Sequence, residues 1–518
     1  MAAELVRIFG WFLLCFPVFL LVSGVCFGAG GARSGSARYP RGMLLSRPDV
    51  PRPSPAACDK ARLLLERALG PSKVLTDHDA CERFVRDESE AVGVVPDAVV
   101  LAENADDILA ALRVAREAEV PITPRSGGTG RTGGSVPVAG GIVLSTLGMK
   151  SIVEIDRREG IAVVQPGVIL ADLHDAVEAE GWFYPPDPNS LASCALGGNV
   201  AENAGGPRAF KYGVTRDYVL GMDAFLIGGQ RIRVGRRTMK GVTGYDVTGL
   251  LVGSEGTLSV FGDITLQLIP KPESVMTMMT LFSNVKQAGA AVQEIIARGL
   301  VPRCIELLDA TTLEAMRSAG NVINPTAGAM LIMEVDGDEA ACERQAERVA
   351  DACETAQVLE VLVAQDAAQR EKLWAARRQM SHAVRKLTKK KLSEDVVVPR
   401  MQIGELLDRV ARTSEELGVR SLTYGHAGDG NLHCNYLWNE DDELPAVERA
   451  IERLFHDVIE LRGTLSGEHG IGVLKAPYLP LEQSPELITL QRDLKRVFDP
   501  GNLLNPGKIF PVGSHRAC

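Results

Sequence analysis

The sequence lacks the cysteine pairs that mark many metal-binding proteins. Its ten cysteines include no C-x-x-C pair, which excludes a zinc ribbon and the ligand set of an iron–sulfur cluster. Cysteines scattered in this way along a chain of 518 residues are instead typical of reduced thiols in a cytosolic protein. The cysteines stand at positions 15, 26, 58, 81, 194, 304, 342, 353, 434 and 518.

Positive charge is also scarce. The formal net charge is −10, and no stripe of Lys and Arg with interleaved aromatic residues is present, which argues against a nucleic-acid-binding protein. The short basic run at 389–391 is interpreted as a solvated surface. A hydrophobic content of 46% with 24% charged residues is typical of soluble globular proteins, and the length allows two or three domains.

One long apolar run is present, at 9–27, and it lies within a leader and linker of residues 1–42. Three interpretations stay open: a signal peptide, a membrane anchor, or a start codon assigned too early. Arginines at 33, 38 and 41 favour keeping the following domain on the inside of a membrane. Because no twin-arginine pair precedes the run, export is the least favoured. We expect a cytoplasmic protein, or one attached to the inner face of the membrane.

The segment around which the chain is organised is the glycine-rich stretch 124–134, PRSGGTGRTGG. Glycine lets the backbone approach a ligand closely, and successive N–H groups in such a loop form an anion site to which a basic side chain adds. Gly128, Gly130 and Gly133 match the G-x-G-x-x-G pattern of a Rossmann turn, but no helix can follow, because Pro137 and further glycines precede a β-branched run. We therefore reject a Rossmann fold and expect a diphosphate-binding loop between two strands.

The residues on both sides of the loop predict strands and helices with two further glycine-bearing segments. The patterns indicate a helix at 58–70, a strand–helix–strand unit at 99–124 in which Asn104 is expected to cap the helix, a hairpin at 151–167 and a helix at about 170–180. Residues 181–213 are non-periodic and rich in Gly, Pro and Asn, and loops of that length are usually functional. A third glycine-bearing segment, 249–272, ends at a domain boundary. Three such segments suit one large ligand with several polar parts.

The motifs RSGGTGRTGG, PPDPNS, GGNVAENAGGPR and LVGSEGTL resemble the FAD-binding domain of the vanillyl-alcohol-oxidase/p-cresol-methylhydroxylase superfamily. The resemblance implies an α+β protein with a two-subdomain FAD-binding domain at 56–272. No His occupies the glycine loop, so the FAD is expected to be non-covalent. The residues that the resemblance places around FAD are Arg125, Ser126, Gly127, Gly128, Thr129, Gly130, Asp187, Gly197, Gly198, Asn199, Asn203, Gly206, Glu255 and Ile264.

From about residue 275 the pattern changes to alternating strands and helices, which predicts a separate α+β cap domain at 273–512, with a C-terminal return segment. The methionines at 276, 278 and 279 are interpreted as core residues. Three histidines, His426, His433 and His469, stand in two glycine-framed segments. Two imidazoles with the carboxylate of Glu468 would make a three-ligand site for a divalent metal. Adjacent Glu468 and His469 are expected to point to opposite sides of an extended turn.

Together with the flavin domain, these segments resemble the FAD-linked D-2-hydroxyacid dehydrogenases and oxidases, over about residues 62–510. This family includes D-lactate dehydrogenase, the glycolate oxidase catalytic subunit and D-2-hydroxyglutarate dehydrogenase. The resemblance implies a zinc-like metal on His426, His433 and Glu468, and His469 as the general base. It also implies substrate contacts by Arg377, which grips the carboxylate, by Asn435, and by Ser381, where a threonine is common. Lys391 is the one candidate for a lysine that some relatives use.

The function implied is oxidation of a small D-2-hydroxy acid to the 2-oxo acid, with hydride transfer to flavin N5. Since Arg377 is the one arginine assigned to a carboxylate, D-lactate is ranked above glycolate, with 2-hydroxyglutarate third. The electron acceptor is left open among oxygen, a quinone, a cytochrome and an iron–sulfur partner protein, and a homodimer is one option. The competing hypotheses are a metallohydrolase, a non-catalytic flavin subunit of a complex, and a redox-neutral flavin transferase.

Overall fold

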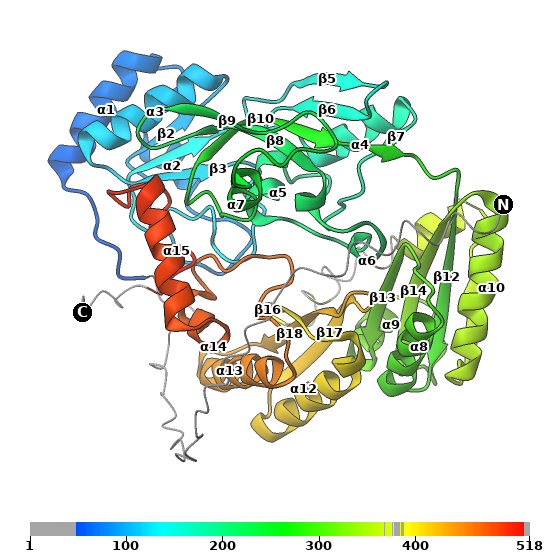
Figure 1. Cartoon of the computed structure of the whole chain (residues 1–518). Coiled ribbons are helices and arrows are strands. Elements are labelled where there is room, and N and C mark those ends of the chain that lie inside the picture. The colour runs from blue at the N-terminus through cyan, green and yellow to red at the C-terminus, as the bar shows by residue number, and fades with distance from the viewer. Residues whose placement is uncertain (1–47, 367, 375–376, 378–383, 385–387, 512–518) are drawn as a thin grey trace, which may run out of the picture. The chain divides into compact units, whose positions relative to one another are not determined.

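The computed structural model of the chain describes residues 48–366, 368–374, 377, 384 and 388–511. Three main sheets and the helices around them make up this part of the chain (Figure 1), and the α+β prediction is confirmed. No helix within these ranges is both long and apolar enough to span a bilayer. The seven cysteines found there are free and buried. The leader and Ser381 lie outside the described residues.

The first sheet delivers the glycine loop. Its strand order is β1-β2-β4-β3, and β2, β4 and β3 run parallel. Helices α1 and α3 pack on it through an apolar core that includes Leu65, Ile108 and Leu112. Asn104 caps α3 by accepting the N–H groups of Asp106 and Asp107, as its N-cap position predicts. The bounds are β1 (Val74–Leu75), β2 (Ala98–Leu101), β3 (Ile122–Arg125), β4 (Ile142–Ser145), α1 (Pro55–Leu69), α2 (His78–Glu82) and α3 (Ala105–Ala118).

The second sheet is antiparallel, in the order β5-β6-β10-β8-β9. The predicted hairpin forms β5 and β6. The segment 181–213, expected to be a loop, instead contains two short helices, α5 and α6. The bounds are β5 (Ile152–Asp156), β6 (Ile161–Val164), α4 (Leu170–Ala179), β7 (Trp182–Phe183), α5 (Leu196–Glu202), α6 (Ala209–Tyr212), β8 (Val219–Phe225), β9 (Arg231–Gly235), α7 (Val247–Leu251), β10 (Val260–Gln267) and β11 (Ile269–Pro270).

The third sheet has seven strands in the order β15-β12-β14-β13-β17-β18-β16, all antiparallel. Helices α8, α10, α12 and α13 cover one face and form the largest core with it (Figure 1), while α9 packs on the other face. The bounds are β12 (Ser274–Phe282), α8 (Val285–Ala297), β13 (Cys304–Asp309), α9 (Ala310–Ser318), β14 (Ala329–Gly337), α10 (Glu339–Thr355), β15 (Glu360–Val363), β16 (Lys390–Val397), α12 (Ile403–Leu417), β17 (Arg420–His426), β18 (Asn431–Trp438) and α13 (Leu444–Glu460).

The C-terminal segment returns to the first sheet. After α14 (Leu479–Glu482) and α15 (Pro485–Phe498), Leu504 forms a parallel bridge with Ile122 of β3 and joins the core of that sheet. The Asn505 side chain donates hydrogen bonds to the carbonyls of Gly134 and Glu255, at 2.9 and 2.7 Å. These bonds tie the end of the chain to two of the three glycine-bearing segments.

Candidate functional site

The glycine loop leaves β3 at Arg125 and lies against the segment before α5. A Cβ on Gly127 would meet the backbone of residues 193 and 195 at 2.9 Å, so only glycine allows this approach. Gly128 has a φ of +68°, in the left-handed region, and a side chain there would also meet Arg125. The Ser126 hydroxyl donates to the Pro166 carbonyl at 2.8 Å. Glycine therefore serves the packing of the segments as well as the approach of a ligand.

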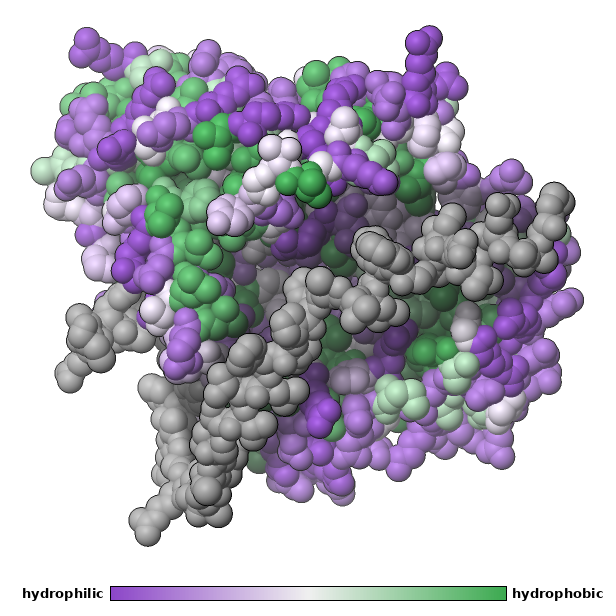
Figure 2. All heavy atoms as spheres, in the orientation of Figure 1, coloured by the Kyte–Doolittle hydropathy of each residue, from purple (hydrophilic) through white to green (hydrophobic). Residues whose placement is uncertain are grey.

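These segments enclose a cavity of about 550 Å³, within the range that ligand sites occupy. Figure 2 shows hydrophilic (purple) residues lining a hollow on one face of the molecule. The cavity is lined by both predicted flavin residues and predicted substrate residues. Among the predicted ones, its walls include Arg125, Ser126, Gly127, Gly128, Thr129, Gly130, Gly197, Gly198, Asn199, Glu255, Arg377, His433, Glu468 and His469.

The polar atoms of the cavity fit a large polar ligand such as FAD. Asn199 Nδ2, Glu202 Oε2 and Ser259 Oγ are buried, and none has a hydrogen-bond partner in the described part of the chain. Burial, with the nearby carboxylate of Glu255, raises the pKa of Glu202 well above its usual value and so favours its protonated, donating form. Unsatisfied buried donors and acceptors are costly, so a bound ligand would stabilise this wall. Arg125 adds a cation beside the loop.

Four of the residues expected around FAD do not line the cavity. Asp187 pairs with the Arg208 guanidinium at 3.0 Å, and Gly206 packs against the Asp187 backbone. Asn203 ends α5 in the left-handed conformation and accepts the N–H of Arg216 at 2.8 Å. Ile264 is fully buried in the core of the second sheet. Their contact with the cofactor stays a prediction.

The candidate metal site lies on the face of the third sheet that α8, α10, α12 and α13 leave uncovered. Side chains alternate along a strand, so Leu432, Cys434 and Tyr436 of β18 join the helix-covered core, while His433 and Asn435 face the other way. Asn435 Nδ2 donates to the His433 carbonyl at 2.8 Å. His426, at the end of β17, lies near His433, with ring centroids 5.3 Å apart.

The structure brings His426, His433 and Glu468 together. Glu468 Oε1 lies 3.5 Å from His426 Nε2 and 3.6 Å from His433 Nε2, and the ligand atoms of the three lie within 4.8 Å of one another. Both Nε2 atoms are buried without a hydrogen-bond partner among the described residues. Two imidazoles and a carboxylate are the donor set of many zinc sites, so the residues fit a divalent metal. Burial lowers the pKa of His433 to about 3, which keeps it neutral, as a metal ligand must be.

Glu306, on β13, connects this site to Arg377. Its carboxylate bonds to His426 Nδ1, accepts a hydrogen bond from Arg377 Nε at 2.8 Å, and forms an ion pair with Arg377 Nη2 at 2.7 Å. Burial would raise the pKa of Glu306, but His426 and Arg377 lower it to about 2. The bond to Nδ1 leaves Nε2 of His426 as the atom that faces Glu468. Arg377, whose guanidinium lies over the Tyr424 ring at 5.0 Å, also lines the cavity.

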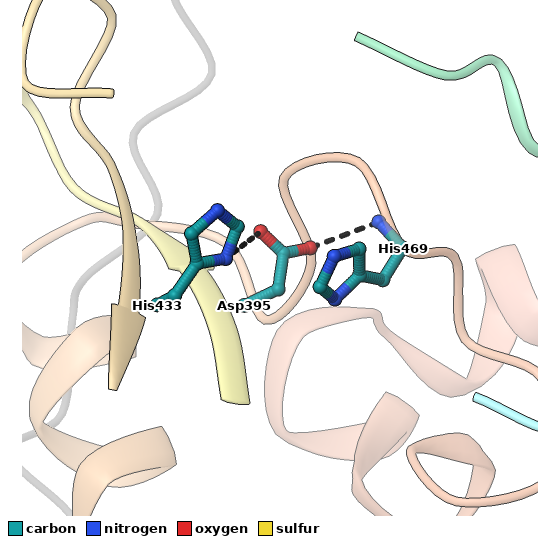
Figure 3. Close-up of side chains that lie close together, drawn as sticks. All are labelled: Asp395, His433 and His469. Carbon is teal, nitrogen blue, oxygen red and sulfur yellow. Dashed lines mark hydrogen bonds and ion pairs between the residues drawn. The ribbon is translucent and has the colours of Figure 1, made fainter. Parts of the chain in front are cut away.

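Asp395, on β16, holds the segment that carries Glu468 and His469. Its Oδ2 accepts the backbone N–H groups of Gly467, Glu468 and His469, at 2.8, 2.9 and 2.9 Å. Its carboxylate lies close to the rings of both His433 and His469 (Figure 3), and the two rings stack on each other with centroids 5.3 Å apart. A second possible metal-binding group is therefore Asp395 with these two histidines.

The expectation that Glu468 and His469 point to opposite sides is wrong. Glu468 Oε1 lies 3.9 Å from His469 Nε2, and both side chains line the cavity, because the three N–H bonds to Asp395 curl the backbone around one carboxylate. Burial is the main cause that lowers the pKa of His469, with Lys475 and Arg131 adding to it and Asp395 and Glu468 opposing it. The imidazole is therefore able to accept a proton at neutral pH.

Sequence reasoning missed Glu306 and Asp395. Both are fully buried carboxylates on strands, Glu306 in the largely apolar CIELLD and Asp395 in the mixed KKLSEDVV. Charged residues are almost never buried without a partner, so a carboxylate inside an apolar strand was the available signal for Glu306, whereas the strand of Asp395 gave no such signal. Lys391, the lysine candidate of the sequence, also lines the cavity.

Comparison with known families assigns both halves of the chain. Residues 96–235 match the family described as "FAD binding domain", and residues 271–509 match "FAD linked oxidases, C-terminal domain". The chain is 42% identical to the glycolate oxidase subunit GlcD of Bacillus subtilis over 419 residues, which cover 80% of this chain and 89% of the relative. It is 34% identical to a D-lactate dehydrogenase of Anaerostipes hadrus, over 86% of this chain and 96% of the relative.

Solved structures with low sequence identity share the fold. The p-cresol methylhydroxylase structure aligns with a TM-score of 0.74 at 15% identity, covering 88% of this chain and 97% of that one. The 4-ethylphenol oxidase of Gulosibacter chungangensis aligns with a TM-score of 0.73 at 19% identity, covering 90% and 99%. These likenesses extend over both the first two sheets and the third, and the expected superfamily fold is confirmed.

Proposed function

The chain belongs to the FAD-linked oxidases, a family of FAD-dependent oxidoreductases, and we propose that it oxidises a small D-2-hydroxy acid, D-lactate first, to the 2-oxo acid. One observation carries the proposal. The guanidinium of Arg377, the imidazole of His469, and two members of a metal-type triad, His433 and Glu468, line the cavity that the glycine loop borders. The names of two relatives, glycolate oxidase subunit GlcD and D-lactate dehydrogenase, support a 2-hydroxy acid as the substrate.

In this proposal the chain's own residues bind the acid and remove its proton. Arg377 binds the substrate carboxylate through the N–H groups that Glu306 does not use, while Glu306 keeps the guanidinium in place. His469 accepts the hydroxyl proton on a ring nitrogen, and Asp395, close to that ring, stabilises the resulting positive charge. When bound, FAD would supply the hydride acceptor and a metal on His426, His433 and Glu468 would supply a Lewis acid for the hydroxyl.

The substrate ranking rests on the carboxylate count. One carboxylate needs one guanidinium, which Arg377 provides, and both named relatives take their names from monoacids. Lys391 in the cavity wall offers a second cation, so a diacid such as 2-hydroxyglutarate belongs among the substrates to be tried. Because the sequence has no iron–sulfur motif, the electrons are proposed to leave to a quinone, a cytochrome or an iron–sulfur partner protein.

The test is anaerobic mixing of the flavoprotein with a panel of D- and L-2-hydroxy acids, followed by flavin absorbance. The proposal expects rapid bleaching by D-lactate, slower bleaching by glycolate, and the corresponding 2-oxo acid as product. Bleaching by D-2-hydroxyglutarate but not D-lactate would overturn the ranking. Bleaching by L-lactate alone would overturn the assigned handedness. A metallohydrolase or a redox-neutral transferase would give no bleaching with any acid.

A further inference from the structure

A second cavity, of about 610 Å³, lies along β16, the edge strand of the third sheet. We call it the outer cavity. It shares four lining residues with the catalytic cavity, so the two adjoin at a neck formed by Glu88, Arg131, Lys391 and Ser393. Because the FAD-type ligand discussed above would take much of the 550 Å³ catalytic cavity, a small substrate needs another way in.

The outer cavity runs from the surface inward. Its rim carries exposed residues, among them Glu90, Lys389 and Lys390, whereas Glu394 and Lys475 on its walls are buried. The rim lysines are used within the chain, because Lys389 pairs with Glu440 at 2.7 Å and Lys390 pairs with Asp441. Because these ion pairs neutralise the two rim lysines, an incoming anion interacts mainly with the charged residues of the neck.

The neck contains two cations, Arg131 and Lys391, the exposed carboxylate of Glu88, and one hydroxyl. Glu88 and Lys391 both interact with other residues, so Arg131 is the cation that carries the argument. Arg131 is half-buried, and in the described part of the chain its side chain makes no ion pair or hydrogen bond. A partly desolvated guanidinium without a partner gains most from an anion, and Arg binds carboxylates in a fork geometry. A quinone would favour an apolar neck instead.

Backbone contacts hold Arg131 beside the catalytic segment. The Gly130 carbonyl accepts the N–H of Glu88 at 3.0 Å. The Thr132 hydroxyl donates to the His469 carbonyl at 3.0 Å, and the Thr132 carbonyl accepts the N–H of Val473 at 2.8 Å. Arg131 is thus fixed between two anchored neighbours, close to the residues that would act on the substrate.

We propose that the outer cavity is the access route for the anionic substrate and that Arg131, at its neck, selects small carboxylates and passes them to the catalytic cavity. This inference rests on the proposed function, because it takes the substrate to be a carboxylate. A cation in such a neck raises the rate of association rather than the rate of the chemical step.

The experiment compares the FAD-loaded wild type with Arg131→Gln, with Arg131→Lys as the conservative variant and Arg158→Gln as a matched control. Arg158 lies exposed in the β5–β6 turn, away from both cavities. Anaerobic stopped-flow mixing with D-lactate gives the second-order rate constant and the limiting rate of flavin reduction at several salt concentrations. The same proteins are also mixed with oxalate, an anion that has no hydroxyl group for the enzyme to oxidise. Its association rate is read from the change in the flavin spectrum.

For Arg131→Gln we expect both second-order constants to fall roughly tenfold or more and to lose part of their salt dependence. Because Arg131 helps to lower the pKa of His469, the limiting reduction rate is compared on the alkaline plateau of its pH profile, where His469 is neutral in every variant. There the limiting rate and the FAD content should change less than about twofold. The association constants of Arg131→Lys should be intermediate, and those of Arg158→Gln should equal the wild-type values. Unchanged association in Arg131→Gln would overturn the proposal, as would loss of FAD, which would assign Arg131 to the cofactor. If D-lactate and the other acids fail to bleach the wild type while oxalate association still depends on Arg131, the proposed function fails and the access route stands.

Discussion

Asp395 accepts the backbone N–H of His469 through the same oxygen that accepts the N–H groups of Gly467 and Glu468. One carboxylate on an edge strand thereby positions both the candidate base and a candidate metal ligand. The Ser466 hydroxyl donates a fourth hydrogen bond to the same oxygen, at 3.1 Å. The geometry of the catalytic segment depends on this one side chain.

Replacing Asp395 by Asn keeps its shape but removes its charge. Hydrogen bonds to charged groups contribute about 1.5–3 kcal/mol each, so we expect flavin reduction to slow roughly tenfold or more with FAD content unchanged. Since the Asp395 charge raises the pKa of His469, its loss should also shift the acid limb of the pH–rate profile to lower pH. Stopped-flow reduction across pH measures both. Asp351→Asn, exposed on α10, is the control, and an unmoved profile with a wild-type rate would contradict the assignment.

Removing the metal should stop turnover but leave the flavin bound. His433 and Glu468, which supply metal-ligand atoms, belong to the C-terminal half of the chain, whereas the glycine loop follows β3 of the first sheet. The variant His433→Ala should therefore lose the metal and its activity but keep its yellow flavin. Metal content and steady-state turnover are compared with those of His456→Ala, an exposed histidine on α13. Full turnover by exhaustively chelated, metal-free protein would reject the site.

The FAD should come off in acid. The loop 125–130 carries no histidine to which the ring could be linked, so acid precipitation is expected to leave the yellow chromophore in the supernatant. Absorbance of the two fractions measures this. Colour retained in the pellet would show a covalent bond.

Stability should fall below about pH 6.5 because of His174. This side chain is 5% exposed on α4, with its Nε2 3.0 Å from the Pro186 carbonyl, and burial is the main cause that lowers its pKa to about 3. The unfolded chain takes up a proton near pH 6.5 and the folded protein does not until about pH 3. The free energy of unfolding therefore declines through this window, by up to about 1.4 kcal/mol per pH unit.

Denaturant unfolding between pH 7.5 and 4.5 tests this expectation. His174→Gln should give a flatter dependence of the unfolding free energy on pH than the wild type, while His456→Gln should not. Equal slopes for His174→Gln and the wild type would refute the role of His174.

The sequence predicted local elements well because their causes are local. Asn104 capped the helix that it was expected to cap, and Met278 is fully buried in the core, with Met276 and Met279 packed against core residues. Helix α5 was missed because Gly197 and Gly198 lower helix propensity, whereas packing of Gly197 against Pro166 makes glycine necessary there.

The site was harder to predict, because its key contacts join residues far apart in the chain. Glu306 meets His426 through the pairing of β13 with β17, across 120 positions, and Asp395 meets His469 across 74. The glycine-framed pattern indicated the histidines and the family resemblance supplied Arg377, but their buried partners depend on strand order in the third sheet. The carboxylate of Glu306 inside an apolar strand was the one local signal.

The most direct test of the account is the single-turnover rate of flavin reduction by D-lactate in the wild type and in His469→Gln. General base catalysis contributes about 10²–10⁴-fold, so the variant should reduce its flavin slower by that factor while keeping FAD, metal and D-lactate binding. Equal rates in the two proteins, or no reduction of the wild type by D-lactate, would contradict the account.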